Sequence, residues 1–281
     1  MELLLSCLRL VSSDDVSVAS KASKVFLALA RQGDQANVLV SSPFVDEMRI
    51  VSQKNDIVRF RIYDIVVTYC CASEEKLMLC EDNQLLESLL GEVSTDDILL
   101  QLNALELLTT FGSCKHGREY LERKGTIQKL AKKLDEATAD PLASLLIPGL
   151  MKFFGVLAHF QPDILSRYSS FTNTMFNSID DSDPTLRMIC IETLSFIATG
   201  SGGKLALREL GTYIPLLSVC SLIQRLCFCL GSRMDNAVKT VGSLFTHGCN
   251  EVRLKALHSF AELIRITPAE VIVKCLYSSH S

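Results

Sequence analysis

An acidic residue followed by an apolar pattern of helical period returns along this chain at nearly constant spacing. The first five occurrences are separated by 41, 41, 43 and 43 residues, and the sixth follows after 68. Apolar residues then recur at three- and four-residue steps, which indicates a helix with one buried stripe, and an acidic side chain at its start is a suitable N-cap. The six acidic residues are Asp15, Asp56, Asp97, Asp140, Asp183 and Glu251.

The copy between residues 96 and 134 has the clearest pattern. Gly112 and Gly125 divide it into three amphipathic segments, and we predict helices at 98–111, 117–123 and 126–134. Three short helices cannot bury their apolar stripes alone, so each copy needs a neighbour of its own kind. A period of about 40 to 47 residues is typical of armadillo and HEAT repeats. We therefore predict an all-α fold, a HEAT/armadillo-like α-solenoid (superhelix) of about six repeats that forms a single domain.

Composition supports a helical protein and excludes some functions. The chain of 281 residues is 48% hydrophobic, yet it has only 7% aromatic residues and no Trp. A net charge of −4 produces no field that would attract a nucleic-acid backbone, so we expect no nucleic-acid partner. The 11 cysteines show no repeated paired spacing, and the first residues do not resemble a secretory signal. We expect reduced thiols in the cytoplasm, or also in the nucleus.

The sequence contains no convincing catalytic, cofactor or metal site. Residues 199–204 resemble a phosphate-binding loop, but the required first Gly and the Ser or Thr after the Lys are missing. Cys114 and His116 flank a repeat turn without an orienting carboxylate, so they do not predict a nucleophile and its base. A set with poor spacing for zinc is formed by Cys227, Cys229, His247 and Cys249. We expect no enzyme activity and no cofactor.

Residues 213–232 do not fit the repeat pattern. Without these 20 residues the long interval of 68 would become 48, close to the period, and the segment holds three cysteines and no acidic residue. We interpret it as an atypical insertion, either a retained intron in the gene model or a variable loop. A membrane span at 213–230 is a poorer interpretation, because Pro215, Gln224 and Arg225 would lie in hydrocarbon.

Four stretches carry a resemblance to a known family. The proteasome non-ATPase regulatory subunit 5 family is resembled by NDIVRFRIYDIVV, HGREYLERKGTIQKL, LIPGLMKFFGVLAHF and DDSDPTLRMICIETLSFIATGSGGKLALRELGT, at 55–67, 116–130, 146–160 and 180–212. The likeness covers most of residues 15–270 apart from the atypical insertion. It implies a HEAT and armadillo-like solenoid that acts as an assembly chaperone for the base of the proteasome regulatory particle. We expect the family's N-terminal and C-terminal repeats to be absent from this chain.

The resemblance also implies a partner. Members of the family bind the C-terminal domain of a proteasomal ATPase subunit, hold a base-assembly intermediate and leave before the mature particle forms. We therefore expect proteasomal ATPase subunits as partners, no membrane, and a monomer apart from its partner. An alternative is a general armadillo/HEAT protein-interaction scaffold with another partner. A transport-receptor or adhesion-type scaffold would be expected to show a ladder of groove Asn and Trp residues, and this chain has no Trp.

Solenoids of this kind bind proteins through a concave groove, which we place on the long helices. These are predicted at 57–70, 98–111, 150–160, 186–198 and 252–264. Residues off the apolar stripes of these helices are free to contact a partner. The candidates, chosen by helical geometry alone, are Arg59, Tyr63, Glu106, Lys152, Arg187, Glu192, Arg253 and Lys255.

Overall fold

The computed structural model describes residues 1–138, 140, 142–178 and 181–213, and these residues form helices and connecting turns without a strand. The chain divides into two compact units, Met1–Gly149 and Leu150–Ser281. The all-α solenoid class predicted from the sequence is therefore confirmed. Calls on residues 214–232 of the atypical insertion, and on the last predicted helix at 252–264, lie outside the described residues.

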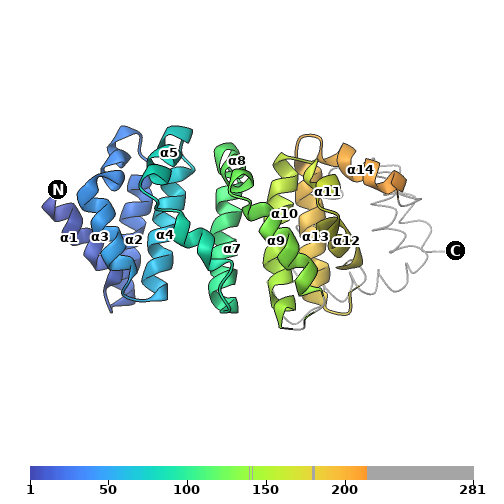
Figure 1. Cartoon of the computed structure of the whole chain (residues 1–281), viewed down its shortest axis with the longest axis horizontal. Coiled ribbons are helices and arrows are strands. Elements are labelled where there is room, and N and C mark those ends of the chain that lie inside the picture. The colour runs from blue at the N-terminus through green and yellow to red at the C-terminus, as the bar shows by residue number, and fades with distance from the viewer. Residues whose placement is uncertain (139, 141, 179–180, 214–281) are drawn as a thin grey trace, which may run out of the picture. The chain divides into compact units, whose positions relative to one another are not determined.

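The first unit is a series of short helices that ends at the start of α10 (Figure 1). Three of its helices are long, and each of these follows a polar capping residue. Its elements in chain order are α1 (Glu2–Arg9), η1 (Leu10–Ser12), α2 (Val16–Ala30), η2 (Asp34–Val40), α3 (Ser42–Ser52), α4 (Asp56–Cys70), α5 (Glu74–Asp82), α6 (Glu87–Glu92), α7 (Ile98–Gly112), α8 (Lys115–Arg123), α9 (Thr126–Ala137) and η3 (Ala143–Leu146).

The long helices of the first unit pack against one another in chain order. Helix α2 contacts α4, and α4 contacts α7, so the three lie side by side in Figure 1. Their facing side chains form the core together with the shorter helices, and the largest fully buried rings include Phe26, Tyr69 and Phe111. This arrangement is that of stacked repeats, in which each repeat buries its apolar stripe against the next.

Helix starts follow the polar residues that the repeat pattern identifies. Asp97 Oδ1 accepts hydrogen bonds from the amides of Leu99 and Leu100, at 2.8 and 3.2 Å, and Asp15 caps α2 in the same way. Asn55, not Asp56, caps α4, through a 2.9 Å bond from the Val58 amide. Helix α7 ends at Gly112, and Gly125, with a φ of 69°, forms the left-handed turn before α9, as predicted.

The second unit contains α10 (Ile147–Phe160), α11 (Ile164–Arg167), α12 (Ser169–Asn177), α13 (Pro184–Thr199) and α14 (Gly203–Tyr213), of which the first turn of α10 belongs to the first unit. Its core is aromatic. Phe153 and Phe154 are fully buried, and the Phe154 ring stacks on Phe171 at 5.4 Å between centroids. Asp183 caps α13 through a 2.8 Å bond from the Thr185 amide.

The segment after Asp140 differs from the prediction. The repeat pattern predicts a helix that starts after Asp140, but a 3-10 turn comes first and α10 begins at Ile147. Pro148 therefore occupies the first turn of α10, where its missing N–H costs nothing. The helical stretch Ala143–Phe160 has a mean hydropathy of 1.5 over 18 residues, enough for a membrane span by composition, but half of it is buried. Core helices of soluble proteins share this property.

The cap at Asp97 gives the first prediction. Asp97→Ala removes the acceptor for two otherwise unpaired amides and is expected to lower the free energy of unfolding by about 1 kcal/mol. Asp96→Ala is the matched control, because Asp96 is exposed and lies one residue before the cap. Urea denaturation followed by helical circular dichroism measures both variants, and equal effects would contradict a capping role for Asp97.

Candidate protein-binding surface

Two long helices of the first unit, α4 and α7, each leave one stripe uncovered. The exposed and half-exposed residues recur at steps of three and four, as on one face of a helix. The members on α7 follow their counterparts on α4 by 42 positions, so equivalent residues lie on neighbouring helices in register. We call this the third-helix surface, because α7 is the third of the consecutive helices α5, α6 and α7. It comprises Ile57, Arg61, Asp64 and Thr68 of α4 and Leu99, Asn103, Glu106 and Thr110 of α7.

Large apolar side chains stand exposed at the beginning of the long helices. Ile57 is 67% exposed, Leu99 is 70% exposed, and Val16 at the start of α2 is also 70% exposed. Single exposed apolar residues are common on protein surfaces, but Ile57 and Leu99 each lie two residues after their N-cap, Val16 lies one residue after its own, and the three helices contact one another. They therefore form a row along one edge of the stacked helices, a feature that suits contact with another protein.

Carboxylates lie next to this row. Burial raises the pKa of Asp64 above its usual value, and the negative charge of Glu106 on the neighbouring helix acts in the same direction, while Arg31 opposes them. Glu106 itself is exposed. Asp64 and Glu106 thus place two carboxylates at the centre of the third-helix surface beside one basic member, Arg61, whose guanidinium donates to the Val11 backbone oxygen at 2.9 Å. The two carboxylates offer charge complementarity to a basic segment of a partner.

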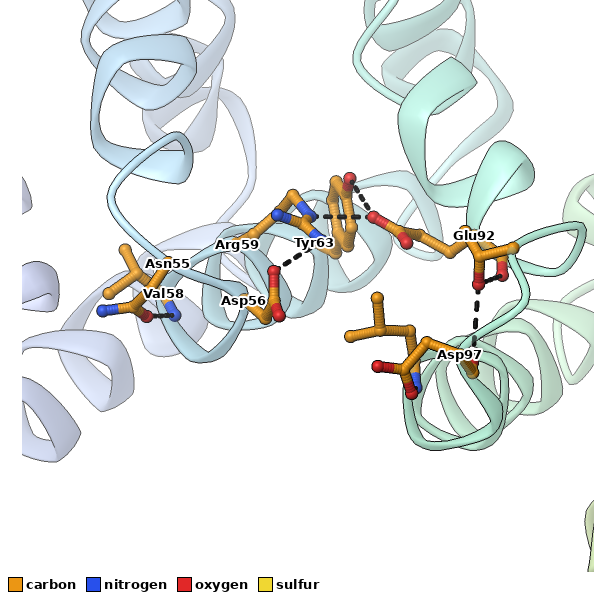
Figure 2. A network of polar contacts seen from close by, with 9 residues as sticks. Asn55, Asp56, Val58, Arg59, Tyr63, Glu92 and Asp97 are labelled. Carbon is orange, nitrogen blue, oxygen red and sulfur yellow. Dashed lines mark hydrogen bonds and ion pairs between the residues drawn. The ribbon is translucent and has the colours of Figure 1, made fainter.

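Arg59 and Tyr63 belong to an internal network instead (Figure 2). Arg59 Nε lies 2.8 Å from Glu92 Oε1, and its guanidinium also pairs with Asp56 at 2.8 Å. The Tyr63 hydroxyl donates to the same Glu92 oxygen at 3.2 Å. These contacts connect helix α4 to the end of α6. The Thr95 hydroxyl lies within hydrogen-bond distance of two backbone oxygens, that of Glu92 and that of Asp97, the cap of α7.

This network corrects one expectation. Tyr63 was predicted to lie off the buried stripe and free for a partner, but it is only 5% exposed. The reason is that α4 is covered on more than one side, so a residue off the main stripe still packs against α6. Burial raises the pKa of Tyr63 to about 12, and the charge of Glu92 adds to the effect. Arg59 is half-buried, with its charge already balanced by two carboxylates.

The remaining candidates have different environments. Glu106 and Lys152 are exposed, and Glu192 is half-exposed, as an off-stripe position predicts. Arg187 is half-buried and donates to the backbone oxygens of Asp181 and Ser182, the latter at 3.0 Å, so it holds the turn before α13. Contact of any of these residues with a partner stays a prediction. The other two candidates, Arg253 and Lys255, lie outside the described residues.

Sequence reasoning missed Glu92 and the apolar row. Glu92 is only 7% exposed although nothing in its short helix distinguishes it from a solvated glutamate. The row could have been found, because Val16 and Ile57 each follow the acidic residue that marks a repeat, and Leu99 comes two positions after Asp97. Within the described part of the chain, no group of three or more His, Cys, Asp or Glu residues could hold a metal ion.

Comparisons with known proteins concern nearly the whole chain. The family model described as Proteasome non-ATPase 26S subunit matches residues 1–278. The chain is 28% identical over 271 residues to the 26S proteasome non-ATPase regulatory subunit 5 of Bos taurus, covering 96% of this chain and 50% of that protein. Its identity to the Homo sapiens protein of the same name is 27%, with the same coverage. The chain thus spans about half the length of the curated relatives it matches.

Among solved structures, a similar one is the crystal structure of an engineered protein. The TM-score is 0.50 and the sequence identity 14%, and the match covers 92% of this chain and 98% of that protein. At this identity the likeness concerns the fold alone.

The internal network gives the second prediction. Glu92→Ala removes the acceptor for Arg59 and the buried Tyr63 hydroxyl, and we expect the free energy of unfolding to fall by about 2 to 3 kcal/mol. Glu87→Ala on the same helix is the control, because its ion pair with Lys124, at 2.9 Å, is exposed and should contribute less than about 1 kcal/mol. Urea denaturation compares the two. A loss no larger for Glu92→Ala than for Glu87→Ala would show that the network adds little stability.

Proposed function

Because the chain belongs to the family of proteasome non-ATPase 26S subunits, we propose that it acts as an assembly chaperone for the base of the proteasome regulatory particle and binds a proteasomal ATPase subunit. The observation that carries this proposal is the match of the family model over residues 1–278, together with relatives named as regulatory subunit 5. The chain corresponds to about half of each of these relatives, so the partner and the role stated for it are proposals.

The third-helix surface is the proposed contact region in the first unit. It combines exposed apolar side chains with the carboxylates of Asp64 and Glu106, and none of its residues belongs to the Arg59–Glu92 network. Association through such a surface would gain from burial of Leu99 and Ile57, while Asp64 and Glu106 would select a basic segment of the ATPase subunit. In the second unit we propose the exposed Lys152 as a residue that contacts the partner.

A chaperone of this type needs no chemical step. It occupies an interface on the ATPase subunit until another subunit displaces it. Its affinity for the ATPase subunit therefore has to be low enough for this exchange. We propose that the protein is non-enzymatic, acts in the cytoplasm and is a monomer apart from its partner. The alternative, a scaffold for a partner unrelated to the proteasome, is an outcome of the experiments that follow.

Charge reversal tests the carboxylates of the third-helix surface. Glu106→Arg is expected to weaken binding to the C-terminal domain of the cognate proteasomal ATPase subunit by about tenfold, which corresponds to about 1.4 kcal/mol. Asp135→Arg on α9 is the matched control, because Asp135 is exposed but lies outside the third-helix surface. Isothermal titration calorimetry against each purified ATPase C-terminal domain measures the affinities. If no ATPase domain binds the unaltered chain, the proposed partner is wrong.

Removal of an apolar contact tests the row. Leu99→Ser should reduce the same affinity at least about fivefold, since a side chain that becomes buried at an interface contributes about 1 kcal/mol or more. Met78→Ser on α5 is the control, because Met78 is 60% exposed and lies away from the row. Equal affinities of the two variants would place the ATPase contact elsewhere on the molecule.

A pull-down from cytosol with and without residues 213–232 shows whether the atypical insertion affects recovery of the partner.

A further inference from the structure

Two cysteines from successive repeats lie next to each other in the first unit. Cys71 is the C-cap residue of α4, and Cys114 is the N-cap residue of α8. Their Sγ atoms are 3.6 Å apart, and both side chains are half-buried and within reach of small solutes. The proposed function makes no use of this pair.

The surroundings of Cys114 favour its thiolate. Cys114 is the N-cap residue of α8, so its sulfur lies near the positive end of the helix dipole. Position 117 has to be a glycine here, because a Cβ atom would lie 2.8 Å from Cys114 Sγ and 2.1 Å from the Phe111 backbone oxygen. The hydrogen bond with Cys71 lowers the pKa of Cys114, and His116, the Gly117 N–H and Arg118 act in the same direction against the effect of burial.

The hydrogen bond between the two sulfurs can in principle run in either direction. In the reduced pair Cys114 Sγ donates toward Cys71 Sγ, and it also lies 3.2 Å from the Phe111 backbone oxygen, to which its thiol can donate. Once Cys114 has lost its proton, the Cys71 thiol becomes the donor, and this contact lowers the pKa of Cys114 and raises the pKa of Cys71. This division of roles is the one required for disulfide formation, with one reactive thiolate and one protonated thiol in contact with it.

We propose that Cys71 and Cys114 are a site of reversible oxidation, at which a hydroperoxide such as hydrogen peroxide converts the two thiols into a disulfide between α4 and α8. The Cys114 thiolate attacks a peroxide oxygen, the O–O bond breaks, and a sulfenic acid forms as hydroxide leaves and takes up a proton. The Cys71 sulfur then attacks Cys114 Sγ. The S–S bond forms, the S–O bond breaks, and the proton from Cys71 leaves with the hydroxyl group as water. A dithiol reductant reverses the change and is itself oxidised to a disulfide.

The disulfide would fasten one repeat of the solenoid. Bond formation shortens the sulfur–sulfur distance from 3.6 Å to about 2.05 Å, a movement that side-chain rotation and small helix shifts can supply. The bond would enclose residues 72–113, which include α5, α6, α7 and the α7 half of the third-helix surface. Oxidation therefore restricts opening of the segment that carries Glu106 and Leu99.

Other cysteines in the described residues are less suited to this reaction. Cys190 is fully buried, and burial raises the pKa of its thiol. Cys70 and Cys80 are also close to each other, but both are buried in the core, and the pKa of Cys70 is raised by the hydrogen bond with Cys80 and by burial. A peroxide reaches them only if the repeat opens.

Peptide mapping of the oxidised chain tests the proposal. The fully reduced, full-length protein is treated with a small excess of hydrogen peroxide, blocked with N-ethylmaleimide, digested and analysed by mass spectrometry without reduction. We expect a linked peptide pair that joins the segments containing Cys71 and Cys114, and its loss after dithiothreitol. The unaltered chain alone gives this result, so the outcome does not depend on whether a variant folds.

Variants locate the bond. Cys71→Ser should abolish the link and leave a sulfenic acid at Cys114 that dimedone traps, whereas Cys70→Ala should retain the link. In the unaltered chain, oxidation should raise the midpoint of thermal unfolding by about 5 °C or more. A link between Cys70 and Cys80 in place of Cys71 and Cys114, or two thiols that both remain reduced, would overturn the proposal. Binding of an ATPase subunit is not part of the readout, so this result is independent of the proposed function.

Discussion

Burial of each long helix between its neighbours is the constraint on which the first unit depends. Helix α4 shows this clearly, since seven of its 15 residues are β-branched and such residues are weak helix formers. In isolation a segment of this length and composition would be a marginal helix. Packed between α2 and α7, all of these Ile and Val side chains except Ile57 are buried in the core, with Ile65 and Val67 at most 1% exposed. The neighbours therefore stabilise the helix more than its own sequence does.

Polar contacts determine how the neighbouring helices are aligned. Glu92 accepts from two side chains of α4 and is itself part of the turn that leads to the cap of α7. A buried carboxylate that lost these donors would be costly, so the contact favours one register between α4 and α6. Arg59 and Tyr63 lie on a different face of α4 from Asp64, so the network supports the proposed binding surface indirectly, by holding α4 against the end of α6.

Features that repeat along the sequence could be predicted, and single long-range contacts could not. The caps at Asp15, Asp97 and Asp183 and the turns at Gly112 and Gly125 follow from local backbone chemistry, so the pattern identified them. Tyr63 was assigned to the wrong side because the pattern considers one buried stripe per helix, whereas α4 is covered on several sides. The helix after Asp140 begins later than the pattern predicts, at Ile147, where Pro148 fits the first turn. The environment of Glu92 depends on residues 29 and 33 positions away, which no local pattern contains.

The hydrogen bonds join residues that are close in the sequence, and this affects how the protein can fold during its synthesis. Among the hydrogen bonds of the described residues, the bond between Arg61 and the Val11 backbone oxygen joins partners as far as 50 positions apart, and the others span less. Chains with such local contacts fold quickly, and folding can proceed from the N-terminal end during translation. Each long helix can thus dock onto the preceding one soon after it leaves the ribosome, before the distant part of the polypeptide exists. Nascent-chain arrest at a point where α7 has fully left the ribosome would therefore be expected to present α2, α4 and α7 already assembled.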